Sequence, residues 1–256
     1  MKVSIITVTH NSSKYLQECF DSVVNQTYAD IEYIVIDGKS TDGTIDIIKQ
    51  YQKKIAKWVS EKDKGIYDAI NKGMKMASGD VIGILHSDDI LASNTVISQI
   101  AKCFQEHKVD SLYGDLVYVD QKNTKKIIRY WKGLSYSRFR FNYGWMPAHP
   151  TFYFRRDLLA DLGDYESHYF TAADYEFMAR YLYRYRISAT YLPLLIVKMR
   201  VGGQSNKNII NRLRANRRDY LAMKINNIPF PHIASILKPI IKLRQYYYTL
   251  FKKVED

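Results

Sequence analysis

The chain has 256 residues, of which 46% are hydrophobic, and it carries a formal net charge of +12. This length and apolar content allow a sizeable core and exclude a chain dominated by disordered linkers. Two cysteines, Cys19 and Cys103, make no disulfide framework and favour a reducing compartment. No run of 18 apolar residues is present, so no membrane span is predicted.

Three short apolar runs rich in β-branched residues predict buried parallel strands. They are VSIITV (3–8), IEYIVI (31–36) and DVIGIL (80–85), and none of them alternates cleanly between apolar and polar residues. The first run turns polar at once, so we expect a strand at the N-terminus rather than a signal peptide.

Apolar residues at three- and four-residue spacing predict helices between these strands. The clearest patterns are SKYLQECFDSVVNQ (13–26) and IYDAINKGMKMA (66–77). The resulting βαβα order implies right-handed crossovers and a parallel sheet whose ligand site lies beyond the carboxyl ends of the strands.

Polar residues follow each predicted strand, as that rule requires. They occur in TVTHN (7–11), DGKSTDGT (37–44) and HSDD (86–89). Because the carboxyl ends of parallel strands lie at one edge of a sheet, we expect these three loops to converge there.

The second of these loops has two interpretations. An Asp-Gly turn followed by a helix cap at Ser40, Thr41 or Asp42 would explain it structurally. Alternatively, Asp37 accepts hydrogen bonds from a base or ribose at the sheet edge. No GxxxxGK or GxGxxG phosphate loop is present.

The adjacent carboxylates of Asp88 and Asp89 repel each other unless a cation or a hydrogen-bond donor intervenes. Mg²⁺ and Mn²⁺ bind carboxylate oxygens together with substrate phosphates, and a departing diphosphate needs its charge neutralised. Asp89 is therefore predicted to bind the metal, and Asp88 to orient ribose or water. A cap for the next helix is the structural alternative, although Ser93 or Asn94 would serve that purpose better.

The segments TVTHN, DGKSTDGT, DKGIYDAINKGMKMASGD and HSDD occur in this order and resemble the family 2 glycosyltransferases of GT-A fold. The resemblance covers residues 1 to about 205 and is closest to bacterial polysaccharide and lipopolysaccharide enzymes. It implies an α/β fold: a Rossmann-like, mixed, mainly parallel sheet flanked by helices, with a C-terminal helical extension. It also implies inverting, hexosyltransferase-type transfer from a nucleotide-diphosphate sugar, UDP by frequency in the family, aided by Mn²⁺ or Mg²⁺.

The resemblance also assigns residues. Those implied to bind the nucleotide are Thr7, Thr9, Asn11, Asp37, Asp63, Asp68, Asn71, Gly73 and Asp88. The implied metal ligands are Asp89 and His149. One departure is His86, which stands where many relatives carry an acidic or amide residue.

In the second half, Asp174 lies where family members place a general base, although relatives often have Glu-Asp in place of Ala173-Asp174. One base is sufficient, because inversion needs no covalent intermediate. A helix N-cap is the alternative role for Asp174. The leaving diphosphate needs positive charge, for which the metal, His149 and Arg180 are candidates. His149 is equally consistent with a buried, hydrogen-bonded side chain.

The C-terminal segment is the basic element of the chain. Residues 207–256 hold 11 basic and 3 acidic side chains, a net +8, interleaved with apolar and aromatic residues. This pattern is typical of an interfacial helix and predicts contact with an anionic membrane surface. A solvated helical face or a nucleic-acid patch are the alternatives. The preceding RVGGQSN (200–206) is either a loop that closes over the donor or a plain linker.

We therefore expect a glycosyltransferase domain over 1–205 and a basic amphipathic helical tail over 206–256. Within the domain, 1–110 is the nucleotide-sugar half and 111–205 the acceptor half. The expected acceptor is lipid-linked or a growing polysaccharide, and the expected location is cytoplasmic, at the inner face of the membrane. A nucleotidyltransferase would need a basic Gly-rich loop, which is absent. A nucleic-acid-binding protein would not explain carboxylates at three strand ends, so no nucleic-acid partner is expected.

Overall fold

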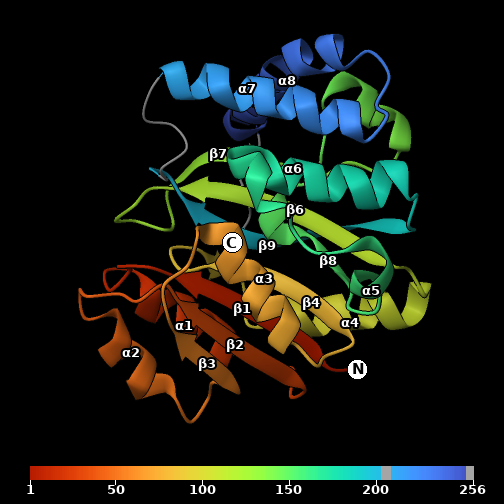
Figure 1. The fold of residues 1–256 in the computed structure, drawn as a ribbon. Helices are drawn as coiled ribbons and strands as arrows, with labels where there is room; N and C mark the ends of the chain where they lie inside the picture. The colour runs from red at the N-terminus through yellow and green to blue at the C-terminus, as the bar shows by residue number, and fades with distance from the viewer. Residues whose placement is uncertain (203–208, 252–256) are drawn as a thin grey trace.

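The computed structural model describes residues 1–202 and 209–251, which form a curled sheet flanked by helices (Figure 1). Within these residues nine strands form one sheet in the order β3-β2-β1-β4-β8-β6-β9-β5, and β7 pairs with β6. The strands are β1 (Val3–Thr9), β2 (Ile31–Asp37), β3 (Lys57–Ser60), β4 (Val81–His86), β5 (Ile90–Leu91), β6 (Ser111–Val119), β7 (Ile127–Trp131), β8 (Tyr153–Arg155) and β9 (Ala189–Arg200).

The first four strands are mutually parallel, which confirms the prediction for this half. Their register places Thr9 opposite Asp37, Val8 opposite His86, and Asp37 opposite Ser60. The three polar loops therefore do emerge at one edge. The short β3 was not predicted, because its four residues are only partly buried and have no apolar run.

The rest of the sheet mixes directions. β8 runs antiparallel between β4 and β6, β9 runs parallel to β6, and β5 and β7 are antiparallel additions. Consequently β6 and β9 point the same way as β1 and β4, so the second half of the sheet delivers these strand ends to the same edge.

Helices cover both faces of the sheet (Figure 1). They are α1 (Leu16–Val24), α2 (Thr44–Tyr51), α3 (Ile66–Met76), α4 (Val96–His107), α5 (Leu158–Leu162), α6 (Ala173–Met178), α7 (Ile209–Ile225) and α8 (Pro231–Phe251). Shorter turns are the 3₁₀ segments η1 (Arg138–Tyr143), η2 (His149–Thr151) and η3 (Ser167–Ala172), and a π-helical continuation of α6, η4 (Ala179–Arg184).

Alternate residues of the central strands enter two separate cores. In β1, Ile5 packs toward the side of α1 and α4, whereas Ile6 packs toward α3 and α6. This alternation explains the unbroken apolar runs of the sequence, since both faces of each strand are covered.

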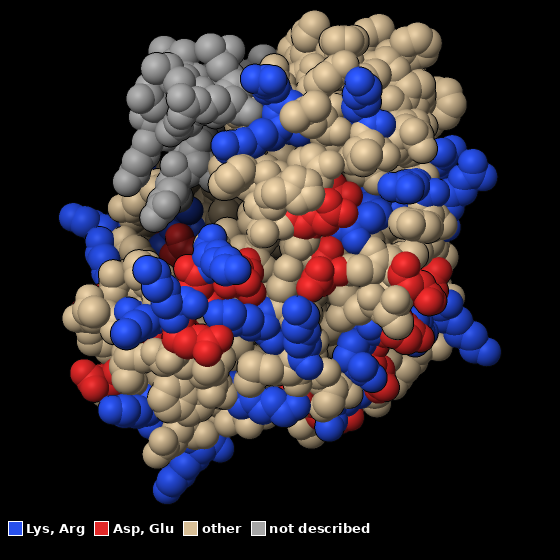
Figure 2. Space-filling model, in the orientation of Figure 1, with Lys and Arg blue, Asp and Glu red and all other residues tan. Residues whose placement is uncertain are grey.

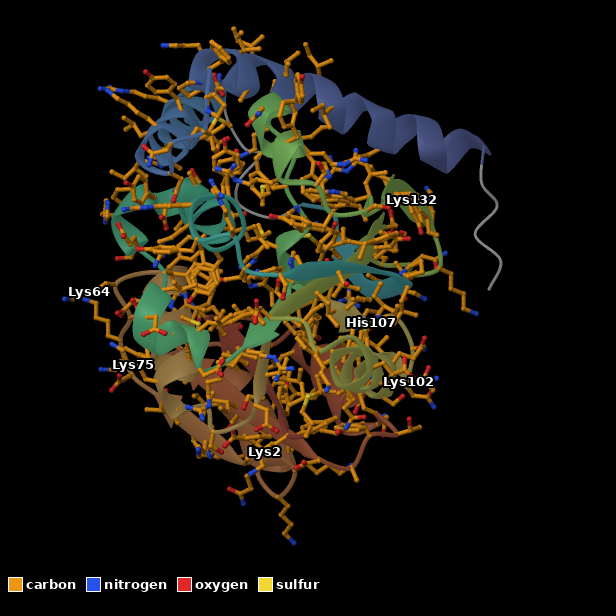
Figure 3. The ribbon with its side chains drawn as sticks, turned by 90° about the vertical axis from the view of Figure 1, so that its right-hand side faces the viewer. Lys2, Lys64, Lys75, Lys102, His107 and Lys132 are labelled. Carbon is orange, nitrogen blue, oxygen red and sulfur yellow. The ribbon has the colours of Figure 1, made fainter. Side chains whose placement is uncertain are left out.

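The two C-terminal helices lie across one end of the molecule, opposite Lys2 (Figure 3). They contribute Ala222, Met223 and Ala234 to the core that contains α3 and α6, and the connection between them adds Ile228. The expected helical extension is thus present, and its inner face is an integral part of the core. No helix in the described part of the chain is long and apolar enough to cross a membrane.

Glu32 anchors the edge of the sheet away from the polar loops. Burial alone would raise its pKa, but the Lys57 ammonium at 2.8 Å and donors from Ser4 and Ser78 lower the pKa from 4.5 to about 2. This stabilisation is therefore complete above about pH 4.5 and is lost as the pH falls toward about 2.

We expect Glu32→Gln to lower the free energy of unfolding by about 2–3 kcal/mol at pH 7. The difference from wild type should shrink as the pH falls below about 4.5, because the carboxyl group of the unfolded chain then takes up a proton while the native carboxylate, whose pKa is about 2, stays ionised. Urea unfolding at pH 7, 4.5 and 3 measures this. A difference that stays constant across this range would contradict the assignment.

Candidate active site

The first and second polar loops are fastened to each other. The backbone N–H of Asn11 donates to Ser40 Oγ at 2.8 Å, and the backbone N–H of Thr41 donates to the side-chain Oδ1 of Asn11 at 2.9 Å. Asn11 has a φ of 50°, in the left-handed region where Asn is tolerated better than most residues. Its side chain therefore shapes the rim of the site.

Asp37 lies fully buried at the end of β2. Its carboxylate accepts hydrogen bonds from the Ser40 N–H at 3.0 Å and from Ser60 Oγ at 2.6 Å. Asp37 thus organises its own turn, as the structural interpretation proposed. The suggested helix cap is not formed, because the N-cap of α2 is Gly43.

The two threonines of β1 differ in what they reach. Thr7 Oγ1 lies in the core and accepts a hydrogen bond from the Tyr33 hydroxyl at 3.0 Å. Thr9 Oγ1 is buried and has no hydrogen-bond partner among the described residues. A buried hydroxyl without a partner fits a ligand-binding position, so Thr9 is the stronger of the two candidates.

Asp63 and Asp68 surround a lysine that the sequence analysis did not single out. Lys72 Nζ lies 2.6 Å from Asp63, 2.8 Å from Glu61 and 3.7 Å from Asp68. Hydrogen bonds to Asp63 and Glu61 raise the Lys72 pKa, so its charge persists at all physiological pH values. This cluster sets the entry of α3 beside Gly38, whose position lies next to Asp63 Oδ2.

Asn71 and Gly73 join α3 to its neighbours. Asn71 donates to the Tyr165 carbonyl at 2.7 Å and accepts from the Tyr165 N–H at 2.9 Å. A Cβ on Gly73 would lie 2.4 Å from Ile6 Cγ2, so only glycine allows the helix to approach β1 this closely. These are packing roles, and direct contact of either residue with a nucleotide stays a prediction.

The Asp88-Asp89 turn contains the most unusual carboxylate of the site. Asp89 is fully buried, and neither carboxylate oxygen has a hydrogen-bond partner within the described residues. Burial and then the Asp88 charge raise its pKa well above the ordinary range, while Arg200 opposes them. An orphaned, buried carboxylate of this kind fits a missing cation.

Arg200 clamps this turn from the end of β9. It donates to the Asp88 carbonyl at 2.7 Å, pairs with Glu18 at 2.6 Å, and lies 4.6 Å above the Tyr15 ring. The residue opens the RVGGQSN segment, to which no firm role had been given; residues 203–206 of that segment lie outside the described residues. The sequence shows a single basic residue at the start of this segment, but it does not show that Arg200 contacts the Asp88-Asp89 turn.

His149 fits the interpretation of a buried, hydrogen-bonded histidine. Its Nε2 lies 2.7 Å from the Tyr165 hydroxyl, and its ring stacks on His86 with centroids 5.9 Å apart. Burial, and then His86, lower the His149 pKa to about 3, so the ring is neutral. It therefore supplies no positive charge to a leaving group at neutral pH.

Asp174 lies in the first turn of α6 but is not its N-cap. The N-cap is Ala172, and no side chain caps this helix. Asp174 is half-buried and accepts from the adjacent Tyr175 N–H at 2.7 Å. The alternative role as an N-cap is thus excluded.

Carboxylates from both halves of the chain shift the pKa of the same two side chains, His86 and Tyr118. Burial lowers the His86 pKa, and both Asp88 and Asp174 oppose this. Burial raises the Tyr118 pKa, and both Asp89 and Asp174 add to the rise, while Arg129, 3.6 Å above the Tyr118 ring, lowers it. The Asp pair and Asp174 therefore lie within electrostatic reach of common neighbours. Acidic and basic side chains are mixed over the middle of the face that Figure 2 shows.

Arg180 does not serve the leaving group. Its guanidinium is buried, pairs with Glu176 at 3.0 Å and donates to the carbonyls of Leu162 and Asp164. These contacts use its donors to fasten α6 to the loop after α5. The suggestion of Arg180 as a phosphate contact is therefore wrong.

The described residues contain no group of three or more His, Cys, Asp or Glu side chains arranged to hold a metal. This suits a metal held by one or two carboxylates and completed by substrate phosphates and water. Asp89, with its unpaired oxygens, fits such a metal. His149 bonds to Tyr165 through Nε2, and its role as a metal ligand stays a prediction.

Residues 4–163 match the model of the family described as "Glycosyl transferase family 2". The chain is 29% identical over 224 residues to a PGL/p-HBAD biosynthesis glycosyltransferase of Mycobacterium tuberculosis, covering 84% of this chain and 85% of that protein.

Two solved structures share the fold. S. aureus TarS 1–349 in complex with UDP-GlcNAc superposes with a TM-score of 0.65 at 20% identity, covering 90% of this chain and 73% of that one. The mannosyltransferase PcManGT from Pyrobaculum calidifontis, in complex with GDP-Man and Mn²⁺, superposes with a TM-score of 0.66 at 18% identity. The match covers 97% of this chain and 74% of that one. The chain spans 44% of a longer TarS chain.

Proposed function

The chain belongs to glycosyl transferase family 2, and from this premise we propose that it is an inverting, metal-assisted enzyme with Asp89 as metal ligand and Asp174 as general base. The chain is a glycosyltransferase of GT-A fold with a mixed sheet, as the resemblance predicted. The proposal adds the roles of individual residues and the stereochemistry to that assignment.

One observation carries the proposal: Asp174, from the second half of the chain, lies within electrostatic reach of His86 together with Asp88, and of Tyr118 together with Asp89. A transferase must neutralise the departing diphosphate and deprotonate the acceptor hydroxyl at one sugar. The buried Asp89 with its half-buried neighbour Asp88, and the half-buried Asp174, would supply carboxylates for the two tasks. A nucleic-acid-binding protein would have no use for this arrangement, and a nucleotidyltransferase would need the basic Gly-rich loop that the sequence lacks.

Asp89 would hold the divalent metal, which supplies positive charge to the diphosphate when bound. Arg200 keeps the Asp88-Asp89 turn in place through the Asp88 carbonyl. Asp37, Thr9 and Asn11 line the loops where the base and ribose would lie, and Asp174 would accept the acceptor proton.

The donor is proposed to be a UDP-sugar. TarS 1–349 is described in complex with UDP-GlcNAc and PcManGT with GDP-Man, so related folds accommodate either nucleotide. A thermal-shift screen of UDP, GDP, dTDP and CMP, each with and without Mn²⁺, identifies the nucleotide directly.

We expect nucleotide binding to be linked to the metal at Asp89. At a hundredfold excess over Kd, a ligand that binds only the folded state stabilises it by about 2.7 kcal/mol. UDP with Mn²⁺ should therefore raise the melting temperature of wild type by several degrees and that of Asp89→Ala much less.

The matched control is Asp80→Ala, which removes an exposed carboxylate at the start of β4, away from the polar loops. It should respond to UDP and Mn²⁺ as wild type does. An equal shift in Asp89→Ala and wild type would remove Asp89 from the metal site.

The acceptor is proposed to be lipid-linked or a growing polysaccharide, and the enzyme to rest on the inner face of the cytoplasmic membrane. Two features support the membrane contact. The segment 207–256 carries a net +8. The outer faces of α7 and α8 also expose large apolar side chains at Leu221, Ile225, Phe230, Ile233, Ile236 and Ile240.

We expect the double variant Arg217→Glu/Lys224→Glu to weaken binding to anionic vesicles at least about tenfold, since each basic residue near such a surface contributes about 1 kcal/mol. Both side chains are exposed on α7. The control Lys2→Glu/Lys102→Glu changes the charge equally on residues away from α7 and α8 (Figure 3). Sedimentation with vesicles at low and high salt measures the effect, and equal binding of both variants would end the anchoring proposal.

A further inference from the structure

An apolar groove lies between η1 and α8, outside the catalytic residues. Its volume is about 350 Å³, within the range of small-molecule sites. The lining residues are Leu134, Arg140, Tyr143, Trp145, Leu237, Ile240 and Ile241. Apart from Arg140, the lining is almost entirely hydrocarbon and aromatic.

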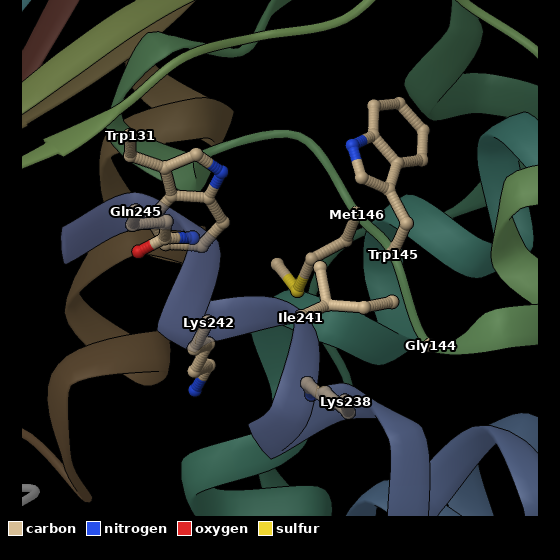
Figure 4. Close-up of a pocket in the computed structure, with 8 residues that line it drawn as sticks. All are labelled: Trp131, Gly144, Trp145, Met146, Lys238, Ile241, Lys242 and Gln245. Atoms are coloured by element: carbon tan, nitrogen blue, oxygen red, sulfur yellow. The ribbon is translucent and has the colours of Figure 1, made fainter. Parts of the chain in front are cut away.

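A smaller cavity beside α8 adjoins the groove. Trp145 and Ile241 line both, and the smaller cavity also reaches Lys238 and Lys242 (Figure 4). Lys238 is held by Asp219 at 2.7 Å. Lys242 is exposed and lies within electrostatic reach of Asp174. Lys238 Nζ also lies 4.0 Å from the centre of the Tyr175 ring, so the inner end lies beside the residue that follows the proposed general base.

The outer end of the groove opens on the exposed apolar side chains of α8. Ile240 lines the groove and is 53% exposed, and Ile236, one turn earlier, is 63% exposed. An apolar chain could thus enter from this side without crossing a polar rim.

Arg140 is the charged residue of the groove lining. Arg140 Nε is buried and makes no hydrogen bond within the described residues. A guanidinium nitrogen in this position matches an anionic oxygen, for which arginine is well suited. The groove therefore offers an apolar wall and a cationic donor together.

We propose that this groove binds the aliphatic chain of a phosphate-bearing lipid acceptor, with Arg140 contacting the phosphate and the sugar-accepting head directed past Lys242 to Asp174. This rests on the proposed function and selects its lipid-linked acceptor over a free polysaccharide. A free polysaccharide has no apolar chain to fill the groove.

The other possible occupants fit less well. A bilayer surface would contact the projecting Ile233 and Ile236 and would leave a concave groove unfilled. A second copy of the chain would bring its own basic helices against Arg140, Lys238 and Lys242, and like charges would repel.

The test compares dodecyl phosphate with butyl phosphate, both kept below micelle-forming concentration, by calorimetric titration of the full chain. Each buried methylene contributes about 0.8 kcal/mol, so lengthening the chain should tighten binding at least about 100-fold even with partial burial. Equal affinity for the two probes would overturn the proposal.

Variants locate the binding. Ile240→Asn and the groove-filling Leu237→Trp should each weaken dodecyl phosphate binding about tenfold. Arg140→Gln should weaken the two phosphates by a similar factor without changing their ratio. The matched control is Ile233→Asn, on the same helix at 52% exposure against 53% for Ile240 but outside the groove, and it should bind as wild type does.

The alternatives give different results. Unchanged dodecyl phosphate binding in Ile240→Asn and Leu237→Trp overturns the proposal, and loss of vesicle sedimentation in the same variants would then assign the face to a bilayer. A change in sedimentation coefficient without a change in binding would assign it to a second copy. The shift with UDP and Mn²⁺ should persist in every variant; its absence from wild type would count against the proposed function and not against the groove.

Discussion

Asp174→Asn will lower the transfer rate by roughly 10² to 10⁴ while leaving donor affinity close to that of wild type. The amide keeps the size of the carboxylate but does not take the acceptor proton. An interaction made mainly in the transition state is lost, so kcat falls and KM for the nucleotide sugar stays nearly constant. Initial-rate kinetics with a saturating acceptor measure both values.

The structure reduces the number of other carboxylates that could act as the general base. Glu176 is buried and paired with Arg180 at 3.0 Å, so it is a poor substitute base. Asp164 is more exposed and lies 3.8 Å from Lys75, which makes Asp164→Asn the matched control. Near-normal transfer by Asp174→Asn together with a large loss in Asp164→Asn would move the base to Asp164.

Deleting residues 207–256 will destabilise the whole domain by about 5 kcal/mol or more. Met223 and Ile228 are almost fully buried, and burial of each such side chain contributes about 1.5–3 kcal/mol before the cavity left behind is counted. Native domains are stable by only about 5–15 kcal/mol, so the truncated chain should melt far below the full chain or aggregate. A detachable anchor, as the sequence alone suggested, would leave the melting temperature unchanged.

Point variants separate packing from surface effects within the same helix. Met223→Ser removes a fully buried side chain and should lower the free energy of unfolding by about 3 kcal/mol. Ile225→Ser changes a side chain that is 51% exposed and should alter it by less than about 1 kcal/mol. Equal melting temperatures of Met223→Ser and Ile225→Ser would mean that α7 is not part of the core.

The sequence by itself determined the nucleotide half of this protein. Strand runs at 3–8, 31–36 and 80–85 became β1, β2 and β4 to within one residue, because strands buried on both faces leave a continuous apolar pattern. The parallel direction and the convergence of the three loops followed from βαβ topology. The Asp88-Asp89 pair was also readable, since adjacent carboxylates at a strand end have few structural uses.

Only the tertiary structure decided which polar side chains lack a hydrogen-bond partner among the described residues. Thr7 and Thr9 look alike in the sequence, yet one bonds to Tyr33 and the other has no described partner. Likewise, Arg200 meets the Asp88 carbonyl across 112 residues. Hydrogen bonds between segments far apart along the chain leave no local periodicity, so composition and spacing do not reveal them.

The C-terminal helices show the same division. Their charge and apolar content were visible in the sequence, but an amphipathic pattern does not specify what the apolar residues contact. Packing divides them: Ala222, Met223 and Ala234 enter the core, while Ile233 and Ile236 stay outside. The physical reason is that burial depends on which surfaces the fold leaves uncovered, and that is settled only when the sheet, η1 and α6 are already in place.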